Sequence, residues 1–223
     1  GKAVKGLVIM GPDLEDVANG ILLNKQPAFW QKNSYPSLKP MSSYVADLVA
    51  RMNFFTDWMD NGHPANYWLS GFFFTQSFLT GQLQNFARKK KFPIDTLIWT
   101  FNFLKKEITH HPKPEEGCIV YGLFMDGARW CNDKQVIQDS LPKVLFSEIP
   151  HMHWIPCEKD KDPTDMSKVY PSPIYKTSER KGVLSTTGHS TNFVCTIKIP
   201  IAPEHSAKFW IKRGVACLCQ LDD

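Results

Sequence analysis

Three potential metal ligands, His151, His153 and Cys157, lie close together in the sequence. One residue separates the two histidines, so a β-strand would place both imidazoles on the same face. Zinc prefers imidazole and thiolate ligands, and its sites need four protein ligands or three with an open position. The sequence offers no clear fourth ligand beside this group and no Cys-x-x-Cys pair. We therefore predict that the protein holds no metal ion.

A second group of reactive side chains lies at residues 185–191, which read STTGHST. A phosphate-binding loop would need a lysine and more glycines than the one present here. His189 and Ser190 are adjacent, so an extended backbone would point them to opposite faces, and no Gly-x-Ser-x-Gly motif is present. We predict no catalytic residue and no nucleotide or other cofactor. The hydroxyl groups are expected to satisfy backbone groups in a tight loop.

The charged residues argue against nucleic-acid binding. The 223 residues include 26 basic and 22 acidic side chains, which gives a net charge of +4. The basic residues cluster at positions 88–91, RKKK, whereas a phosphate-binding surface needs charge concentrated over a whole face. Cations in the last turn of a helix complement the helix dipole, so we predict that this cluster closes a helix. His110 and His111 precede a proline and are expected on the surface of a turn.

The most aromatic segment covers residues 67–74, YWLSGFFF. Such a run fits either the core of a helical layer or an exposed docking surface. Core is the favoured single role. A domain built to pack on a larger body could use the run for both.

The composition describes a folded protein without a membrane span. Apolar residues make up 43% of the sequence, enough to bury the core of one large domain or two small ones. Cys195, Cys217 and Cys219 lie in apolar runs, where cysteine behaves as a small buried hydrophobe. With no signal-peptide pattern, we expect a reducing compartment, cytosolic or ciliary. No apolar run approaches the length that crosses a membrane, and no membrane partner is expected.

Helical periodicity dominates the part of the sequence before Pro93. The predicted helices begin near residue 12 and cover residues 42–61 and 73–91. In the second of these, apolar side chains recur every three or four residues: Val45, Leu48, Val49, Met52, Phe55, Trp58 and Met59. Ser42 or Ser43 is the predicted N-terminal cap, and Gly62 follows the predicted end. Residues 1–92 are therefore predicted to form a helical subdomain.

Short β-branched and aromatic segments follow residue 93. The predicted strands cover residues 96–104, 118–125, 128–130, 143–146, 152–157, 172–176, 192–199 and 210–219. Asp126 and Gly127 form a favoured tight-turn pair and predict a hairpin. Residues 159–167 are polar and are expected in an exposed loop. Helices followed by strands indicate an α+β fold, with an antiparallel barrel or sandwich over residues 93–223.

Several longer strings resemble the C-terminal domain of dynein heavy chains. They read YPSLKP at 35–40, WLSGFFF at 68–74, QNFAR at 84–88, VYGLF at 120–124, GARW at 127–130, PSPIYKT at 171–177, STTGHSTNF at 185–193 and WIKRGVACLCQL at 210–221. They run nearly end to end in the family's order, and together they are highly specific. The terminal strings look more axonemal than cytoplasmic.

The resemblance implies one α+β domain, an N-terminal helical layer followed by an incomplete antiparallel β-barrel. It implies a non-catalytic regulatory or structural role, with the domain packed on the ring of ATPase modules of its own heavy chain. Trp68, Phe72 and Phe73 are the candidate ring-docking residues. ATP and Mg²⁺ would be bound elsewhere in the parent protein, a microtubule motor ATPase that moves toward the minus end. Microtubules, intermediate chains and light chains are implied as partners of that motor, in the cytoplasm and cytoskeleton, in the axoneme of a cilium or flagellum.

Two other classes of function remain as alternatives. An independent hydrolase would use His189, or a metal at His151 and His153. A free-standing protein-interaction adaptor would bind through its aromatic or basic surface. Known members of the family are far longer than 223 residues, so we expect this sequence to be a fragment of a larger protein.

Overall fold

A computed structural model describes residues 1–105, 110–183 and 191–223. Its α-helices are α1 (Pro12–Leu23), α2 (Ala28–Asn33), α3 (Met41–Asn61), α4 (Thr75–Lys90) and α5 (Ala207–Lys212). Its strands are β1 (Asn66–Trp68), β2 (Leu97–Phe103), β3 (Cys118–Tyr121), β4 (Phe124–Asp126), β5 (Arg129–Cys131), β6 (Val136–Gln138), β7 (Phe146–Glu148), β8 (Met152–Glu158), β9 (Val169–Tyr175), β10 (Phe193–Pro200) and β11 (Ala216–Leu218). Short 3₁₀ turns lie at Leu69–Gly71, Ile94–Thr96, Lys159–Lys161 and Met166–Lys168.

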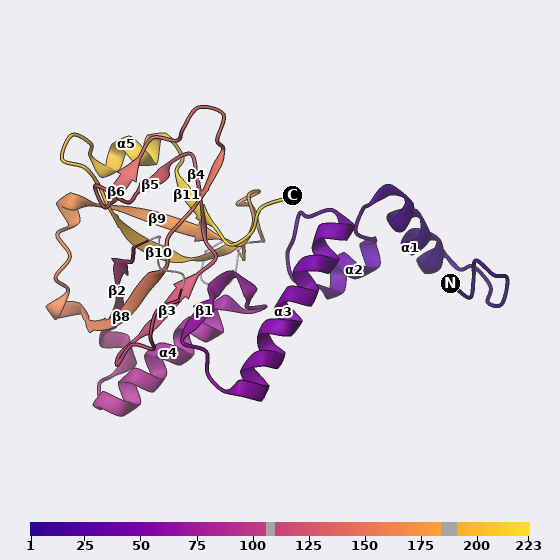
Figure 1. Ribbon diagram of the computed structural model, residues 1–223, viewed down its shortest axis with the longest axis horizontal. Coiled ribbons are helices and arrows are strands. Elements are labelled where there is room, and N and C mark those ends of the chain that lie inside the picture. The colour runs from indigo at the N-terminus through magenta and orange to yellow at the C-terminus, as the bar shows by residue number, and fades with distance from the viewer. Residues whose placement is uncertain (106–109, 184–190) are drawn as a thin grey trace.

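The helices and the sheets occupy different parts of the molecule. Figure 1 shows α1, α2 and α3 extending to one side, while the strands, α4 and α5 gather on the other side. We call residues 1–61 the N-terminal arm and the described residues from 62 onward the β body. The N-terminus lies at the far end of the arm, and the C-terminus lies beside the loop that precedes α3 (Figure 1).

The sequence predicted the bounds of α3 well but not its cap. The helix ends at Asn61, where Gly62 adopts φ 83° and its N–H donates to the Trp58 carbonyl at 2.9 Å. At the other end, neither predicted serine caps the helix, because Pro40 occupies the cap position. The N–H of Ser42 instead donates to Oδ1 of Asn24 at 2.9 Å. A residue at the end of α1 thus caps α3, so the correction rests on a contact between two helices.

The strands form two larger sheets and a small one. Their orders are β1-β3-β8-β2, β10-β9-β11-β4-β7 and β5-β6. Most neighbours are antiparallel, as predicted, but β1 pairs with β3 and β11 pairs with β9 in parallel. Among the described residues the sheets do not close into a barrel, and the incomplete barrel implied by the resemblance is not confirmed. Local alternation reveals a strand but not its partner, which explains why the parallel pairs were missed.

The core lies between the sheets of the β body. Its largest fully buried side chains include Trp154, Trp210, Tyr170, Leu69, Leu123 and Met125. In β8, Met152, Trp154 and Pro156 are buried while the residues between them are partly exposed. Trp154 also meets the ring of Phe101 edge-on, with centroids 4.9 Å apart. This alternation is the pattern of a strand with one face on the core, and it confirms the prediction for residues 152–157.

Three local predictions in the β body are wrong. Residues 143–145 were expected in a strand, but β7 begins only at Phe146. The hairpin at Asp126 and Gly127 is absent, because β4 pairs with β7 and β11 while β5 pairs with β6. Residues 210–212 were expected in a strand but belong to α5, whose Trp210 is fully buried. A short apolar run fits the period of a helix and of a strand equally, so burial against the sheet decides between them.

The predicted division at residue 92 stays a prediction. β1 precedes that position yet pairs with β3, which follows it, so backbone hydrogen bonds cross the proposed boundary. Within the described part of the sequence, every helix is too short or too polar to span a lipid bilayer.

Candidate docking surface

The N-terminal arm exposes several aliphatic side chains. Along α3, Val45, Val49, Met52 and Met59 face solvent, with Val49 52% exposed and Met59 77% exposed. At 100° of turn per residue, these positions fall within about 80° of one another around the helix axis. They therefore form one continuous strip, which we call the aliphatic face of α3.

Exposed apolar side chains also occur in the rest of the arm. In α1, Ile21, Leu22 and Leu23 are exposed, as are the apolar side chains between residues 4 and 10. Of the large apolar side chains in residues 1–61, all of which the structure describes, only Met41 and Tyr44 are buried. Exposed apolar surface gathered in one region marks an interaction site.

The other side of α3 is covered by the β body. Phe54 and Trp58 meet edge-on, and each of them contacts the ring of Phe72, at centroid distances of 5.7 and 6.0 Å. Phe72 in turn stacks on Phe78 of α4, with centroids 4.2 Å apart. This aromatic cluster holds α3 against the body, so the aliphatic face necessarily points away from it.

The three predicted ring-docking residues occupy different environments. Trp68 and Phe72 are half-buried in the aromatic cluster, and Trp68 meets Phe54 edge-on at 6.2 Å. Phe73 is 41% exposed and stacks on Phe55 at 5.7 Å. Their docking role stays a prediction. Sequence reasoning passed over the neighbouring Phe74, which is 63% exposed, because the residues of an aromatic run look alike until the backbone turns.

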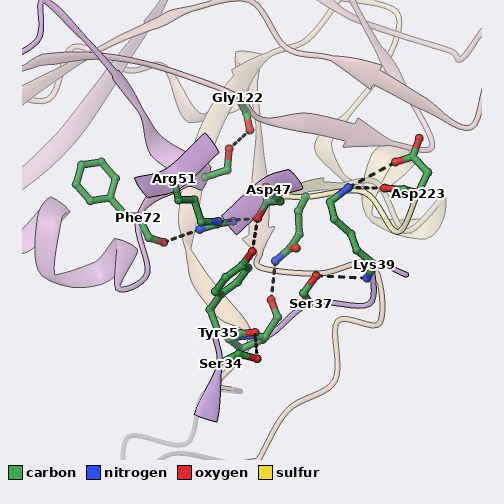
Figure 2. Close-up of polar contacts among 12 residues, drawn as sticks. Ser34, Tyr35, Ser37, Lys39, Asp47, Arg51, Phe72, Gly122 and Asp223 are labelled. Carbon is green, nitrogen blue, oxygen red and sulfur yellow. Dashed lines mark hydrogen bonds and ion pairs between the residues drawn. The ribbon is translucent and has the colours of Figure 1, made fainter. Parts of the chain in front are cut away.

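The buried side chain of Arg51 connects the N-terminal arm to the β body (Figure 2). Arg51 of α3 is only 2% exposed, pairs with Asp47 at 2.6 Å and donates to the carbonyl of Phe72 at 3.3 Å. Its guanidinium lies 4.1 Å from the centroid of the Tyr35 ring, and the Tyr35 hydroxyl donates to Asp47 at 2.6 Å. Burial raises the pKa of Tyr35, and the hydrogen bond to Asp47 raises it further. The charge of Arg51 is thus paired with that of Asp47, as a buried charge requires.

The C-terminal residues make a second connection to the N-terminal arm. The side-chain amide of Gln220 donates to the carbonyl of Pro36 at 2.6 Å. Lys39 donates to the main-chain oxygen of Asp223 at 2.6 Å, and Figure 2 shows the two residues side by side. The loop between α2 and α3 is therefore tied both to α3 and to the C-terminal end.

The predicted metal ligands do not converge. A ring nitrogen of His153 hydrogen-bonds the carbonyl of Glu116 at 2.7 Å, and Cys157 donates to the carbonyl of Glu158. His151 instead packs against His111, with centroids 5.3 Å apart. Among the described residues, no three His, Cys, Asp or Glu side chains are grouped to hold a metal ion. The expected surface position of His111 is wrong in part, because its Nε2 atom is buried.

The remaining sequence candidates are the basic cluster at residues 88–91 and the pair His189 and Ser190. Residues 88–90 form the basic last turn of α4, and Lys91 follows in a left-handed conformation, so the cluster closes a helix as predicted. Lys90 also forms an ion pair with Glu116. His189 and Ser190 lie outside the described residues.

The six cysteines are unpaired. Cys217 and Cys219 are fully buried, and burial raises the pKa of each thiol to about 12. Thiols of this kind are unreactive at neutral pH and act as core side chains.

Comparison with known proteins identifies relatives along the whole sequence. The family model described as the C-terminal domain of the dynein heavy chain matches residues 1–219. The protein is 49% identical over 223 residues to dynein axonemal heavy chain 3 of Mus musculus, covering 100% of this sequence and 5% of that protein. It is 49% identical over 222 residues to dynein axonemal heavy chain 12 of Homo sapiens, covering 100% of this sequence and 7% of that protein. Dynein axonemal heavy chain 1 of Rattus norvegicus is 45% identical over 224 residues, with 99% and 5% covered.

Proposed function

The protein belongs to the family formed by the C-terminal domains of dynein heavy chains, and we propose that it is a docked, non-catalytic regulator within a longer motor protein. It spans only 5% to 7% of the length of the relatives named above. Any activity of the parent protein therefore depends on segments outside this one. The proposal concerns what a single domain can contribute to such a motor.

The aliphatic face of α3 is the observation that carries the proposal. It presents Val49, Met52 and Met59 to solvent on a helix whose other side is already covered by the body. Burying such side chains against a partner is favourable by about 25 cal/mol per Å² of apolar surface. The partner that we propose is the ATPase ring of the same heavy chain. Of the predicted ring-docking residues, Phe73 is the most exposed and the best placed to add an aromatic contact.

Regulation follows if the domain binds one conformation of the ring better than another. Its influence on the motor cycle cannot exceed that difference in affinity, and about 1.4 kcal/mol would change the balance of conformations tenfold. The arm would supply the contact. The β body would respond to this contact, because Arg51 and the aromatic cluster join the arm to the body.

The chemistry of the motor is assigned to the parent protein. We propose that ATP and Mg²⁺ bind there, and that microtubules, intermediate chains and light chains meet this domain only through the assembled motor. The relatives carry axonemal names, so we propose the axoneme of a cilium or flagellum as the location. Nucleic acid and membrane are not part of the proposed function.

A matched pair of variants in the full heavy chain tests the docking step. Val49→Asp places a carboxylate on the aliphatic face, and Ala50→Asp places the same group at an exposed position about 100° further around α3. We expect Val49→Asp to release the domain from the ring, measured by limited proteolysis of the intact motor, and Ala50→Asp to leave it docked. Equal behaviour of the two variants would remove the aliphatic face from the proposal.

The regulatory step is tested by adding the domain back. The ATPase rate of a motor lacking this domain is measured with and without the 223-residue domain, at increasing concentration. A saturable change in rate, with no turnover by the added domain alone, supports a docked regulator. Turnover by the domain alone would contradict it. Salt-sensitive binding to tubulin, lost on neutralising residues 88–91, would favour the adaptor instead.

A further inference from the structure

A cavity of about 700 Å³ lies beside α3, on a different side of the helix from the aliphatic face. Phe54 and Asp57 of α3 form one wall. Asn66 of β1, Tyr121 of β3 and His151, next to β8, line the opposite side, and His111 adds to the lining from the loop before β3. The cavity therefore sits at the junction between the N-terminal arm and the β body.

Three buried polar atoms of this lining have no hydrogen-bond partner among the described residues: Oδ1 of Asn66, Nε2 of His111 and Nδ1 of His151. The amide nitrogen of Asn66 donates to the carbonyl of His111 at 3.1 Å, which leaves the amide oxygen as the unused atom. A buried polar atom without a partner is unfavourable, so three in one cavity point to a ligand that supplies donors.

The charge of the lining also favours a ligand that donates hydrogen bonds. Asp57 contributes a carboxylate, which accepts one hydrogen bond from Asn61 at 2.7 Å and has room for others. The described lining contains no lysine or arginine to balance it. Burial lowers the pKa of His151, so its ring is neutral at neutral pH and can accept a hydrogen bond. The aromatic rings of Phe54 and Tyr121 offer faces that attract a cation.

We infer that this cavity receives the guanidinium group of an arginine from another part of the same heavy chain. A guanidinium carries five N–H donors, no acceptor and an apolar stem, which matches a lining of unused acceptors, one carboxylate and two aromatic rings. A lysine ammonium is smaller and more strongly hydrated, so it fits the wide, partly apolar cavity less well. A metal ion fits less well again, because the described residues place no three charged or imidazole ligands together. The inference rests on the proposed docking and adds the partner's chemistry at a second site.

A photochemical cross-link in the full heavy chain tests the occupant directly. The photoreactive amino acid p-benzoylphenylalanine replaces Ala65, which lines the cavity, in one motor, and Asp60, which is exposed on α3 outside the cavity, in another. We expect position 65, and not position 60, to cross-link to a heavy-chain peptide that contains an arginine next to the cross-linked residue. Cross-links to a different subunit, to a peptide without arginine, or equally from both positions would overturn the inference.

A charge exchange then separates this inference from the docking proposal. Asp57→Asn should weaken protection of the backbone amides of His110 and His111 from hydrogen exchange about threefold, the size expected for one exposed charge pair. Asp57→Arg should weaken it further, and changing the identified arginine to aspartate should restore it in that background. If the restoration fails while Val49→Asp still releases the domain, the cavity inference is wrong and the docking proposal stands. If Val49→Asp does not release the domain from the ring, the docking proposal is wrong, and the cavity inference that rests on it loses its basis.

Discussion

The N-terminal arm and the β body bury their apolar residues to very different extents. In the body, Trp154, Trp210 and most strand residues of the core are almost completely covered by other residues of the same domain. In the arm, by contrast, Met52 is 53% exposed and Met59 is 77% exposed. The body therefore buries its apolar residues within the domain, whereas the arm leaves apolar surface exposed that the proposed partner would cover.

The largest expected effect is a cavity in the body. Trp154→Ala removes a fully buried indole that packs against Trp99 and Phe101. We expect the free energy of unfolding to fall by about 4 kcal/mol, measured by denaturant titration. Met52→Ala in the arm is the control and should change it by less than about 0.5 kcal/mol. Similar losses for the two variants would break the contrast between the regions.

A substitution at the junction between the arm and the body should lower the free energy of unfolding almost as much. Arg51→Met leaves Asp47 as a buried carboxylate without its cation, at a cost of about 3 kcal/mol. Hydrogen exchange should then show loss of protection in α3 before any in the β body. The double variant Arg51→Met with Asp47→Leu should recover most of the loss, because no unpaired charge remains. If the double variant is as unstable as the single one, the junction depends on Arg51 for more than charge pairing.

Acid should loosen the same junction to a smaller degree. Burial lowers the pKa of His151, and the charge of His111 lowers it further. The unfolded protein therefore takes up this proton first, near the ordinary value of 6.5. The stabilisation is complete above about pH 6.5 and is lost as the pH falls toward the lowered pKa of the folded state.

The measurement is the free energy of unfolding at several pH values between about 7 and 5. His151→Asn should flatten the decline that the parent sequence shows over this range. Lowered carboxyl pKa values, as at Glu116 and Asp162, act below pH 4.5 and do not overlap the range. An unchanged slope in the variant would mean that other histidines cause the decline.

The smallest effect on stability is expected where the effect on docking is largest. Val49→Asp adds a charge to a side chain that is already exposed, so the free energy of unfolding should change by less than about 0.5 kcal/mol. Thermal denaturation of the 223-residue domain checks this value. A loss of several kcal/mol would show that the aliphatic face is covered in solution, and the comparison between arm and body would need revision.

Features that depend on near neighbours along the backbone could be predicted from the sequence. Proline at position 12 and glycine at position 62 fix the start of α1 and the end of α3, because their backbone preferences act locally. The alternation in residues 152–157 predicted β8, since side chains of a strand alternate between its two faces. The strings of the family predicted the relationship that the comparisons confirm over residues 1–219.

Features that depend on contacts between distant residues could not be predicted in this way. Asn24 caps α3, β1 pairs in parallel with β3, and Arg51 is buried beneath the aromatic cluster. The helical period of α3 predicted one apolar helix but could not say which residues would face the body. The tertiary contacts decide it, because aromatic side chains cover one side of the helix and leave the aliphatic face exposed, while Trp68 and Phe72 are half-buried.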